Sequence, residues 1–307
     1  MRSILLRHYG GQTAAQVAES PVPVARPGQV LVRVRAAGIN ALDWKVREGH
    51  VRDAFPLELP AVLGIELAGV VEAVGPGATR LRVGDRVMGP LGRLGAYADL
   101  VAVDEDKLAR TPQGLGDVQA AALPVAALAA WQSLNFLGPI RAGSRVLVHG
   151  AAGALGGFAV QFARQAGAFV VGTAGADDLA YVRGLGADQV IDYRSQRFED
   201  LAGDIDLVLA YVGGDVIDRS WTVLKPTGAM VGTASPEILA RTPAGRQGHW
   251  FVMQPDAALL ARLADDVAGG ALKSRVSEVI SFDDIPAAIE RNRVGAHGGK
   301  TVADFTL

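Results

Sequence analysis

The sequence predicts an α/β protein in which a mostly β region precedes a doubly wound parallel sheet. Three observations lead to this prediction. The first hundred residues are short apolar strands separated by glycine turns. From residue 145 to residue 269, apolar strand-like runs alternate with segments of helical periodicity. Residues 275–307 do not continue that alternation cleanly, so we expect them to pack back on the first region.

The composition indicates a globular protein with enough chain for two domains. Its 307 residues are half hydrophobic, and 30 Lys and Arg against 32 Asp and Glu give a net charge of −2. No block of like charge indicates a nucleic-acid or membrane surface. The absence of cysteine excludes disulfides and thiolate zinc sites. Without an apolar run of about 18 residues or a secretory signal, we expect a cytoplasmic protein.

The first region has the pattern of an antiparallel sheet with one face in water. In residues 29–37, valine alternates with Arg33 and Arg35. Residues 41–47 are predicted to form one or two helical turns, with Asn40 as the N-cap. Further strands are expected at residues 2–7, 64–75 and 95–103, with a turn at residues 82–86 that leads into another strand. A barrel-like β domain follows from this pattern.

The second region is predicted to begin with two helices, at residues 117–123 and 125–137, separated by Pro124. Six strands are then expected at residues 145–149, 168–173, 188–192, 205–211, 228–233 and 249–254, with helices at 155–166, 177–185, 215–224 and 256–269. The last part of the chain is predicted to have a strand at 276–282, a helix at 284–293 and a strand at 300–305.

A glycine turn at the start of this alternation predicts a dinucleotide site. Glycines at 150, 153 and 156 lie between an apolar strand and a helix, an arrangement that places a diphosphate against free N–H groups at a helix N-terminus. Gly150 would allow the tight turn, Gly153 the close approach of pyrophosphate, and Gly156 close packing of helix on strand. Ala151 replaces the first glycine of a strict G-x-G-x-x-G, so a glycine-rich connection in an ordinary α/β domain stays an alternative.

Segments along nearly the whole chain resemble one protein family. They are GINALDWKVREG, GIELAGVVEAVG, VGDRVMG, GAYADLVAV, AALPVAALAAWQSL, VLVHGAAGALGGFAVQFAR, LGADQVIDY, VGG at 212–214, VLKPTGAMV and GGKTV. In this order they resemble the zinc-free quinone oxidoreductase group of the medium-chain dehydrogenase/reductase superfamily. The resemblance implies a GroES-like β-barrel catalytic domain of residues 1–118 and 272–307. It also implies a Rossmann doubly wound parallel sheet domain of residues 119–271, with the active site between the two.

The same resemblance identifies where zinc ligands are missing. Zinc-dependent members have a cysteine after a Gly-Ile or Gly-Val pair and a histidine in a Gly-His-Glu run. Here Asn40 and Ile65 hold those positions, while Glu66 remains. Neither side chain is a zinc ligand, which implies hydride transfer without a metal Lewis acid. We therefore expect no metal and an electrophilic substrate, such as a quinone or an α,β-unsaturated carbonyl compound.

The resemblance places Asn40, Asp43 and Lys45 near the nicotinamide as the catalytic residues. Hydride addition to a quinone or enone leaves an anionic oxygen, which a nearby ammonium or amide N–H would stabilise. Lys45 would be the cation and proton donor, Asn40 the neutral donor, and Asp43 the group that orients Lys45. A direct pair between residues 43 and 45 needs an irregular turn. The alternatives are that Asp43 satisfies backbone amides and that Lys45 is a solvated surface charge.

The end of the second Rossmann strand favours NADPH over NADH. No acid follows that strand until Asp177, so nothing there would hold the ribose 2′-OH of NAD. Thr173 would donate to a 2′-phosphate. Tyr193 resembles a tyrosine that lies against the adenosine phosphate in the family, and Arg194 adds charge. The usual base just after the strand is missing, and Arg183 on the next helix is the nearest.

The resemblance implies a wider cofactor-binding set, in which the backbone of residues 250–252 approaches the nicotinamide. The set is Gly150, Ala151, Gly153, Ala154, Leu155, Gly156, Thr173, Tyr193, Val212, Phe251, Val252 and Lys300. Tyr97 and His149 are expected to be structural.

Three functions are consistent with these features. The first is an NADP(H)-dependent, zinc-independent oxidoreductase that transfers hydride to quinones or α,β-unsaturated carbonyls. The second is an enoyl-thioester reductase, which would need a channel for a long acyl carrier. The third is an NADP(H)-binding sensor or structural protein with little turnover, because Lys45 and Ala129 depart from the family pattern. The resemblance also implies a homodimer joined at the edges of the Rossmann sheets, near residues 228–252.

Overall fold

The chain folds into two compact units in a computed structural model that describes residues 1–53, 56–295 and 298–307. One unit comprises residues 1–125 and 255–307, and the other comprises residues 126–254. These limits differ from the boundaries expected at residues 118 and 271. The reason is that helix α8 (Ala257–Ala268) packs against β8 (Ala109–Arg110) of the first unit.

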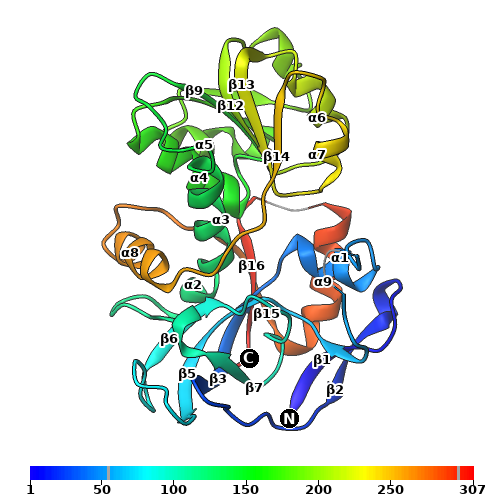
Figure 1. Cartoon of the computed structure of the whole chain (residues 1–307), viewed down its shortest axis with the longest axis vertical. Coiled ribbons are helices and arrows are strands. Elements are labelled where there is room, and N and C mark those ends of the chain that lie inside the picture. The colour runs from blue at the N-terminus through cyan, green and yellow to red at the C-terminus, as the bar shows by residue number, and fades with distance from the viewer. Residues whose placement is uncertain (54–55, 296–297) are drawn as a thin grey trace. The chain divides into compact units, whose positions relative to one another are not determined.

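Antiparallel strands dominate the first unit, as the valine–arginine alternation predicts (Figure 1). The larger sheet has the order β15-β16-β3-β5-β6-β8, with β7 also paired to β3, and the smaller sheet has the order β2-β1-β4. The strands are β1 (Arg2–Leu6), β2 (Ala15–Glu19), β3 (Gln29–Gly38), β4 (Ala61–Val62), β5 (Glu66–Val74), β6 (Arg86–Pro90), β7 (Leu100–Asp104), β15 (Val276–Ser281) and β16 (Lys300–Asp304). Helices α1 (Ala41–Arg47), α2 (Asp117–Ala121) and α9 (Ile285–Val294) accompany them.

Strand β3 determines which distant residues meet in this unit. Its valines are buried, while Arg33 is exposed and pairs with Glu72 of β5. The C-terminal end of β3 pairs with β16, with Gly38 opposite Val302, and Ile39 donates its N–H to the carbonyl of Thr301 at 3.0 Å. This register brings the start of β16 beside the segment that leads into α1.

The second unit is the predicted doubly wound sheet. Its six strands are all parallel, in the order β11-β10-β9-β12-β13-β14. They are β9 (Arg145–His149), β10 (Phe169–Ala174), β11 (Gln189–Asp192), β12 (Ile205–Ala210), β13 (Leu224–Gly232) and β14 (Gln247–Trp250). Figure 1 labels four of them, β9, β12, β13 and β14. The helices are α4 (Ala154–Gln165), α5 (Leu179–Gly184), α6 (Asp215–Ser220) and α7 (Glu237–Ala240), and α3 (Pro124–Leu134) crosses the boundary between the units.

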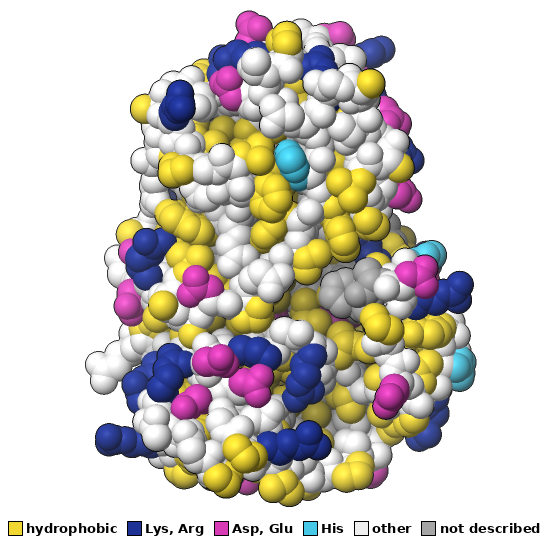
Figure 2. Space-filling view, in the orientation of Figure 1, with side chains coloured by type: hydrophobic (Ala, Val, Ile, Leu, Met, Phe, Trp, Pro, Cys, Tyr) yellow, Lys and Arg dark blue, Asp and Glu magenta, His cyan; other side chains and the backbone are white. Residues whose placement is uncertain are grey.

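Several predicted elements differ in their limits from the observed ones. The strand expected at 95–103 is residues 100–104, and the one expected at 228–233 is residues 224–232. The helix expected at 215–224 ends at Ser220, because Leu224 already pairs with Ile205 of β12. The strand expected at 249–254 is residues 247–250. Acidic and basic side chains are interspersed on the face shown in Figure 2, in keeping with the balanced composition. Among the described helices, none is long and apolar enough to cross a membrane.

Candidate functional site

The glycine turn after β9 has the geometry that the sequence predicts. Gly150 has a φ of 69°, a conformation that L side chains rarely adopt. A Cβ added to Gly156 would overlap the Gly150 carbonyl oxygen and lie 2.7 Å from the Cα of Ala151. The tight turn and the close approach of helix to strand therefore depend on glycine at these two positions.

The first turn of α4 presents backbone N–H groups that a diphosphate would use. Gly153 is the N-cap, with extended backbone angles of −70° and 170°. Ala154 and Leu155 follow, are half-buried, and have N–H groups with no partner inside the helix. Because α4 has twelve residues, the aligned peptide dipoles add to the attraction for an anion. The residues present thus fit a dinucleotide diphosphate.

The sheet brings the other predicted cofactor residues to the same edge. The carboxyl ends of parallel strands lie together, and Gly150, Thr173, Tyr193, Val212 and Phe251 lie at or just after the ends of β9, β10, β11, β12 and β14. The Val212 Cγ1 atom lies 3.3 Å from where a Gly150 Cβ would be. Strand β9 lies between β10 and β12, which is the switch point where such sheets bind ligands. Val252 is also here, whereas Lys300 belongs to the first unit.

A cation from the turn that follows β11 lies beside the residue after β10, where the sequence has no base. The Arg194 guanidinium carbon lies 3.7 Å from where a Cβ on Gly175 would be, directly after β10. The same carbon is 5.7 Å from the ring centroid of Tyr193, which is 57% exposed. The parallel pairing of Ala174 with Asp192 causes this proximity. The sequence has no basic residue directly after β10, but the fold brings the Arg194 guanidinium to that position.

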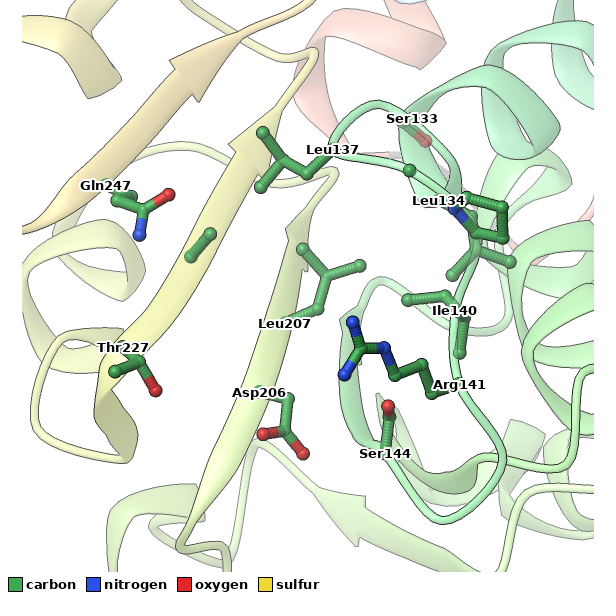
Figure 3. A pocket seen from close by; sticks show the side chains of 13 residues that line it. Ser133, Leu134, Leu137, Ile140, Arg141, Ser144, Asp206, Leu207, Thr227 and Gln247 are labelled. Carbon is green, nitrogen blue, oxygen red and sulfur yellow. The ribbon is translucent and has the colours of Figure 1, made fainter.

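A separate cavity of about 330 Å³ lies in the second unit, away from this edge. Figure 3 shows Arg141, Ser144, Asp206 and Gln247 around it. These residues precede or begin β9, β12 and β14, so the cavity is at the amino ends of the strands. The Asp206 carboxylate is already held by Lys225 at 2.7 Å and by the Arg145 N–H at 2.8 Å. The cavity is therefore distinct from the predicted dinucleotide site.

The first unit contains a buried group of five polar side chains, which we call the polar cluster: Asn40, Asp43, Glu66, Tyr97 and Lys300. The Lys300 ammonium donates to Asn40 Oδ1 at 2.6 Å and lies 2.5 Å from Glu66 Oε1. Asn40 Nδ2 donates to Glu66 Oε1 at 2.8 Å and to the Gly38 carbonyl at 3.2 Å. Both amide hydrogens of Asn40 are therefore used within the protein, and its predicted role as a donor to substrate is not supported by this geometry.

Glu66 connects the polar cluster to the backbone around it. Its Oε2 atom accepts the Val125 N–H at the start of α3, at 2.7 Å. A Cβ at Gly38 would overlap Glu66 Oε1 and lie 2.7 Å from Lys300 Cε. Glycine at position 38 thus makes room for the ion pair. Strand β5 contains a second acid, Glu72, so the sequence signal for Glu66 is its place directly after Ile65, where the family resemblance has a Gly-His-Glu run.

Asp43 caps α1 and does not orient Lys45. Its Oδ2 atom accepts the Asn40 N–H at 2.7 Å and the Tyr97 hydroxyl at 2.7 Å, while its Oδ1 atom is buried without a hydrogen-bond partner. This confirms Asn40 as the N-cap and matches the alternative that Asp43 satisfies a backbone amide. The expected contact to Lys45 is wrong because α1 is regular and residues two apart do not share a face. Burial raises the pKa of Asp43 to about 6.

Tyr97 and Lys45 also differ from what the sequence indicates. Tyr97 is fully buried, and its hydroxyl lies 2.7 Å from Asp43 Oδ2 and 3.0 Å from the Gly38 carbonyl, so it is a polar partner as well as a packing residue. Nothing in the sequence near Tyr97 indicates this contact. Lys45 is half-buried, with its ammonium 5.5 Å from the ring centroid of Trp44. Of the predicted catalytic residues, the structure thus brings Asn40 and Asp43 together, without Lys45.

Comparisons with known proteins agree with this architecture. A family model described as alcohol dehydrogenase GroES-like domain matches residues 26–113, and one described as zinc-binding dehydrogenase matches residues 185–302. The side chains at the zinc positions, Asn40 and Ile65, are not zinc ligands. Within the residues that the structure describes, no three His, Cys, Asp or Glu side chains form a metal-binding group.

Three relatives represent the range of similar sequences. The chloroplast envelope quinone oxidoreductase homolog of Arabidopsis thaliana is 34% identical over 203 residues, 64% of this chain and 62% of that protein. A 2-haloacrylate reductase of Burkholderia sp is 35% identical over 75% of this chain and 73% of its own length. The pikromycin polyketide synthase component PikAII of Streptomyces venezuelae is 38% identical over 71% of this chain but 6% of the synthase. The match thus spans less than two thirds of the Arabidopsis protein.

Solved structures match over almost the whole chain. The quinone oxidoreductase from Coxiella burnetii has a TM-score of 0.93 and 30% identity, covering 99% of both chains. Escherichia coli quinone oxidoreductase, solved with NADPH, has a TM-score of 0.88 and 27% identity, covering 99% of this chain and 100% of that one. Sequence and fold together establish that the chain belongs to the quinone oxidoreductase group of the medium-chain dehydrogenase/reductase superfamily.

Proposed function

We propose that the protein is an NADP(H)-dependent, zinc-independent oxidoreductase that transfers hydride to quinones or α,β-unsaturated carbonyls. The observation that carries the proposal is the second unit's glycine turn, with Arg194 beside the end of β10. When bound, NADPH would supply the hydride. Gly150, Gly153 and the first turn of α4 would hold its diphosphate.

The preference for NADPH rests on charge at the adenosine end of the site. Arg194 presents a guanidinium where an NAD-selective fold places a carboxylate. The E. coli relative of known structure was solved with NADPH. The test is kcat/KM for the two dinucleotides with one acceptor: a higher value for NADPH is expected, and a preference for NADH would reject the assignment.

The ammonium of Lys300 in the polar cluster would donate an N–H to the oxygen of the reduced acceptor. Hydride addition leaves an enolate or phenolate oxygen, and a preorganised cation lowers the energy of that anion. Lys300 has three N–H groups, of which Asn40 and Glu66 take two. Asn40 and Asp43 would then be positioning residues, and Lys45 on α1 the proton donor to test. Lys45→Met should lower kcat if it has that role, and an unchanged kcat would remove it from the mechanism.

The acceptor class is tested by steady-state oxidation of NADPH. We expect turnover with 1,4-benzoquinone, 9,10-phenanthrenequinone or a short enone, and no loss of activity on addition of a chelator. A chelator-sensitive rate would contradict the zinc-independent mechanism, because neither Asn40 nor Ile65 can replace a zinc ligand.

Similarity to a polyketide synthase favours a second candidate, an enoyl-thioester reductase. A 2-enoyl thioester with a much higher kcat/KM than free quinones or enones would select this function. A third outcome, NADPH binding without acceptor-dependent oxidation, would indicate a sensor or structural protein.

We also propose a homodimer formed at the edge of the second unit's sheet. Strand β14 is the last in the order, and in the part of the chain that the structure describes it pairs with β13 alone. Such an edge offers unpaired backbone groups to a second copy. A light-scattering mass near twice 31.9 kDa is expected, and a mass of 31.9 kDa would reject the dimer.

A further inference from the structure

Three buried side chains next to the glycine turn are joined by hydrogen bonds. They are His149 at the end of β9, Thr173 on β10 and Ser220 at the end of α6, which are 1%, 4% and 0% exposed. His149 Nδ1 lies 3.1 Å from Thr173 Oγ1, and His149 Nε2 lies 2.9 Å from Ser220 Oγ. All three side chains belong to the second unit, and none was expected to act together with the others.

The direction of each hydrogen bond follows from the hydrogens available. Ser220 has one hydroxyl hydrogen and donates it to the Val216 carbonyl at 2.6 Å, so it can only accept from His149 Nε2. Burial lowers the pKa of His149 to about 3, so the ring is neutral and Nδ1 carries no hydrogen. The hydroxyl of Thr173 must therefore donate to Nδ1.

Thr173 then contacts the glycine turn only as an acceptor. Its hydroxyl oxygen faces the Gly150 N–H at 3.4 Å, and its carbonyl accepts the Ala151 N–H at 3.0 Å. One residue of β10 thus contacts the backbone N–H groups of both residues that open the turn. The orientation of its hydroxyl is set by His149, and that of the His149 ring by Ser220.

We propose that His149 and Ser220 are positioning residues of the dinucleotide site, which hold the Thr173 hydroxyl so that its oxygen faces the Gly150 amide before a ligand binds. This inference rests on the proposed function. It replaces the expectation that Thr173 donates to a 2′-phosphate, because the single hydroxyl hydrogen of Thr173 is already used. The role should therefore concern the diphosphate, which NADPH and NADH share.

Thr173→Val distinguishes a Thr173 that donates to the 2′-phosphate from one that accepts from the Gly150 amide. Valine has the same shape as threonine but no hydroxyl. We expect it to raise Kd for NADPH and for NADH by the same factor, about three- to ten-fold, as for the loss of one buried hydrogen bond. Thr173→Ser should restore most of the affinity. The matched control is Thr222→Val, whose exposed hydroxyl donates to the Arg219 carbonyl at 2.7 Å and is expected to change neither Kd.

The outcomes distinguish the inference from the proposed function. A loss confined to NADPH would restore Thr173 as a phosphate donor and overturn the inference, as would unchanged binding of both dinucleotides. If the wild-type protein binds neither dinucleotide, the proposed function fails, and the inference fails with it.

A second measurement begins with the wild-type protein, so its first result does not require any variant to fold. Nitrogen NMR of the His149 ring should show the neutral Nε2–H tautomer between pH 8 and pH 5 in the wild type. Ser220→Ala removes the acceptor of that hydrogen, so we expect the Nδ1–H tautomer to become populated and both dinucleotides to bind more weakly. A wild-type ring with its hydrogen on Nδ1, or one that becomes charged above pH 5, would contradict the proposal.

Discussion

The ammonium of Lys300 lies 2.5 Å from the carboxylate of Glu66, and their side chains are 5% and 0% exposed. The two residues come from different parts of the sequence and meet because β16 pairs with the end of β3. A buried ion pair loses hydration at both ends and persists when further hydrogen bonds satisfy the two groups. Asn40 and the Val125 N–H provide those bonds here.

Removing the cation should therefore be costly. We expect Lys300→Met to lower the free energy of unfolding by about 3–5 kcal/mol, because Glu66 would remain charged and buried. The double variant Lys300→Met, Glu66→Gln should lose less than the single one. Arg33→Met is the control in the same sheet: its exposed pair with Glu72 should contribute about 0–1 kcal/mol. Urea denaturation measures both variants. If Lys300→Met and Arg33→Met lose the same free energy of unfolding, the pair between Lys300 and Glu66 does not behave as a buried pair.

The raised pKa of Asp43 gives a pH dependence with a defined sign. The folded pKa is about 6 against a usual 3.8, so between these values the folded state holds the extra proton. The contribution of Asp43 to the free energy of unfolding is therefore fully present below about pH 4. It is lost as the pH rises to 6, because the unfolded state releases this proton more readily than the folded state does. Relative to Asp43→Asn, the wild type should lose on the order of 3 kcal/mol over that window. Asp265→Asn, at an exposed position of α8, is the control.

The free energy of unfolding should be measured by urea denaturation at pH 4, 5, 6 and 7 for the wild type, Asp43→Asn and Asp265→Asn. A constant difference between wild type and Asp43→Asn across this range would show that Asp43 has an ordinary pKa.

Two adjacent glycines of α4 provide a matched pair for the dinucleotide turn. A Cβ at Gly156 would overlap the backbone of Gly150 and Ala151, whereas one at Gly157 would meet the ends of the Leu185 and Tyr181 side chains at 3.3 and 3.4 Å. Gly156→Ala should abolish dinucleotide binding. Gly157→Ala should bind normally and gain up to about 1 kcal/mol from helix propensity. Calorimetric titration with NADPH distinguishes the two, and normal binding by Gly156→Ala would mean that this close contact is not required.

Arg194 should determine discrimination between the two dinucleotides. Arg194→Ala is expected to weaken NADPH binding roughly tenfold, as for the loss of a charge-assisted contact with phosphate, and to leave NADH unchanged. Arg183→Ala, on the exposed face of α5, is the control and should change neither. If Arg183→Ala has the larger effect on NADPH, the cation nearest in sequence binds the phosphate instead.

Local sequence determined the strand–glycine–helix unit at residues 145–165, the N-cap at Asn40 and the alternation that produces the antiparallel sheet. Each of these features depends only on residues that are close together in the sequence. Only the tertiary structure brought Lys300 to Asn40, Tyr97 to Asp43, and Arg194 to the end of β10. Those contacts depend on the register between strands far apart in sequence, which no short segment encodes. The same reason applies to Thr173: its residue type predicts a donor, whereas the buried ring of His149 makes its oxygen an acceptor toward the glycine turn.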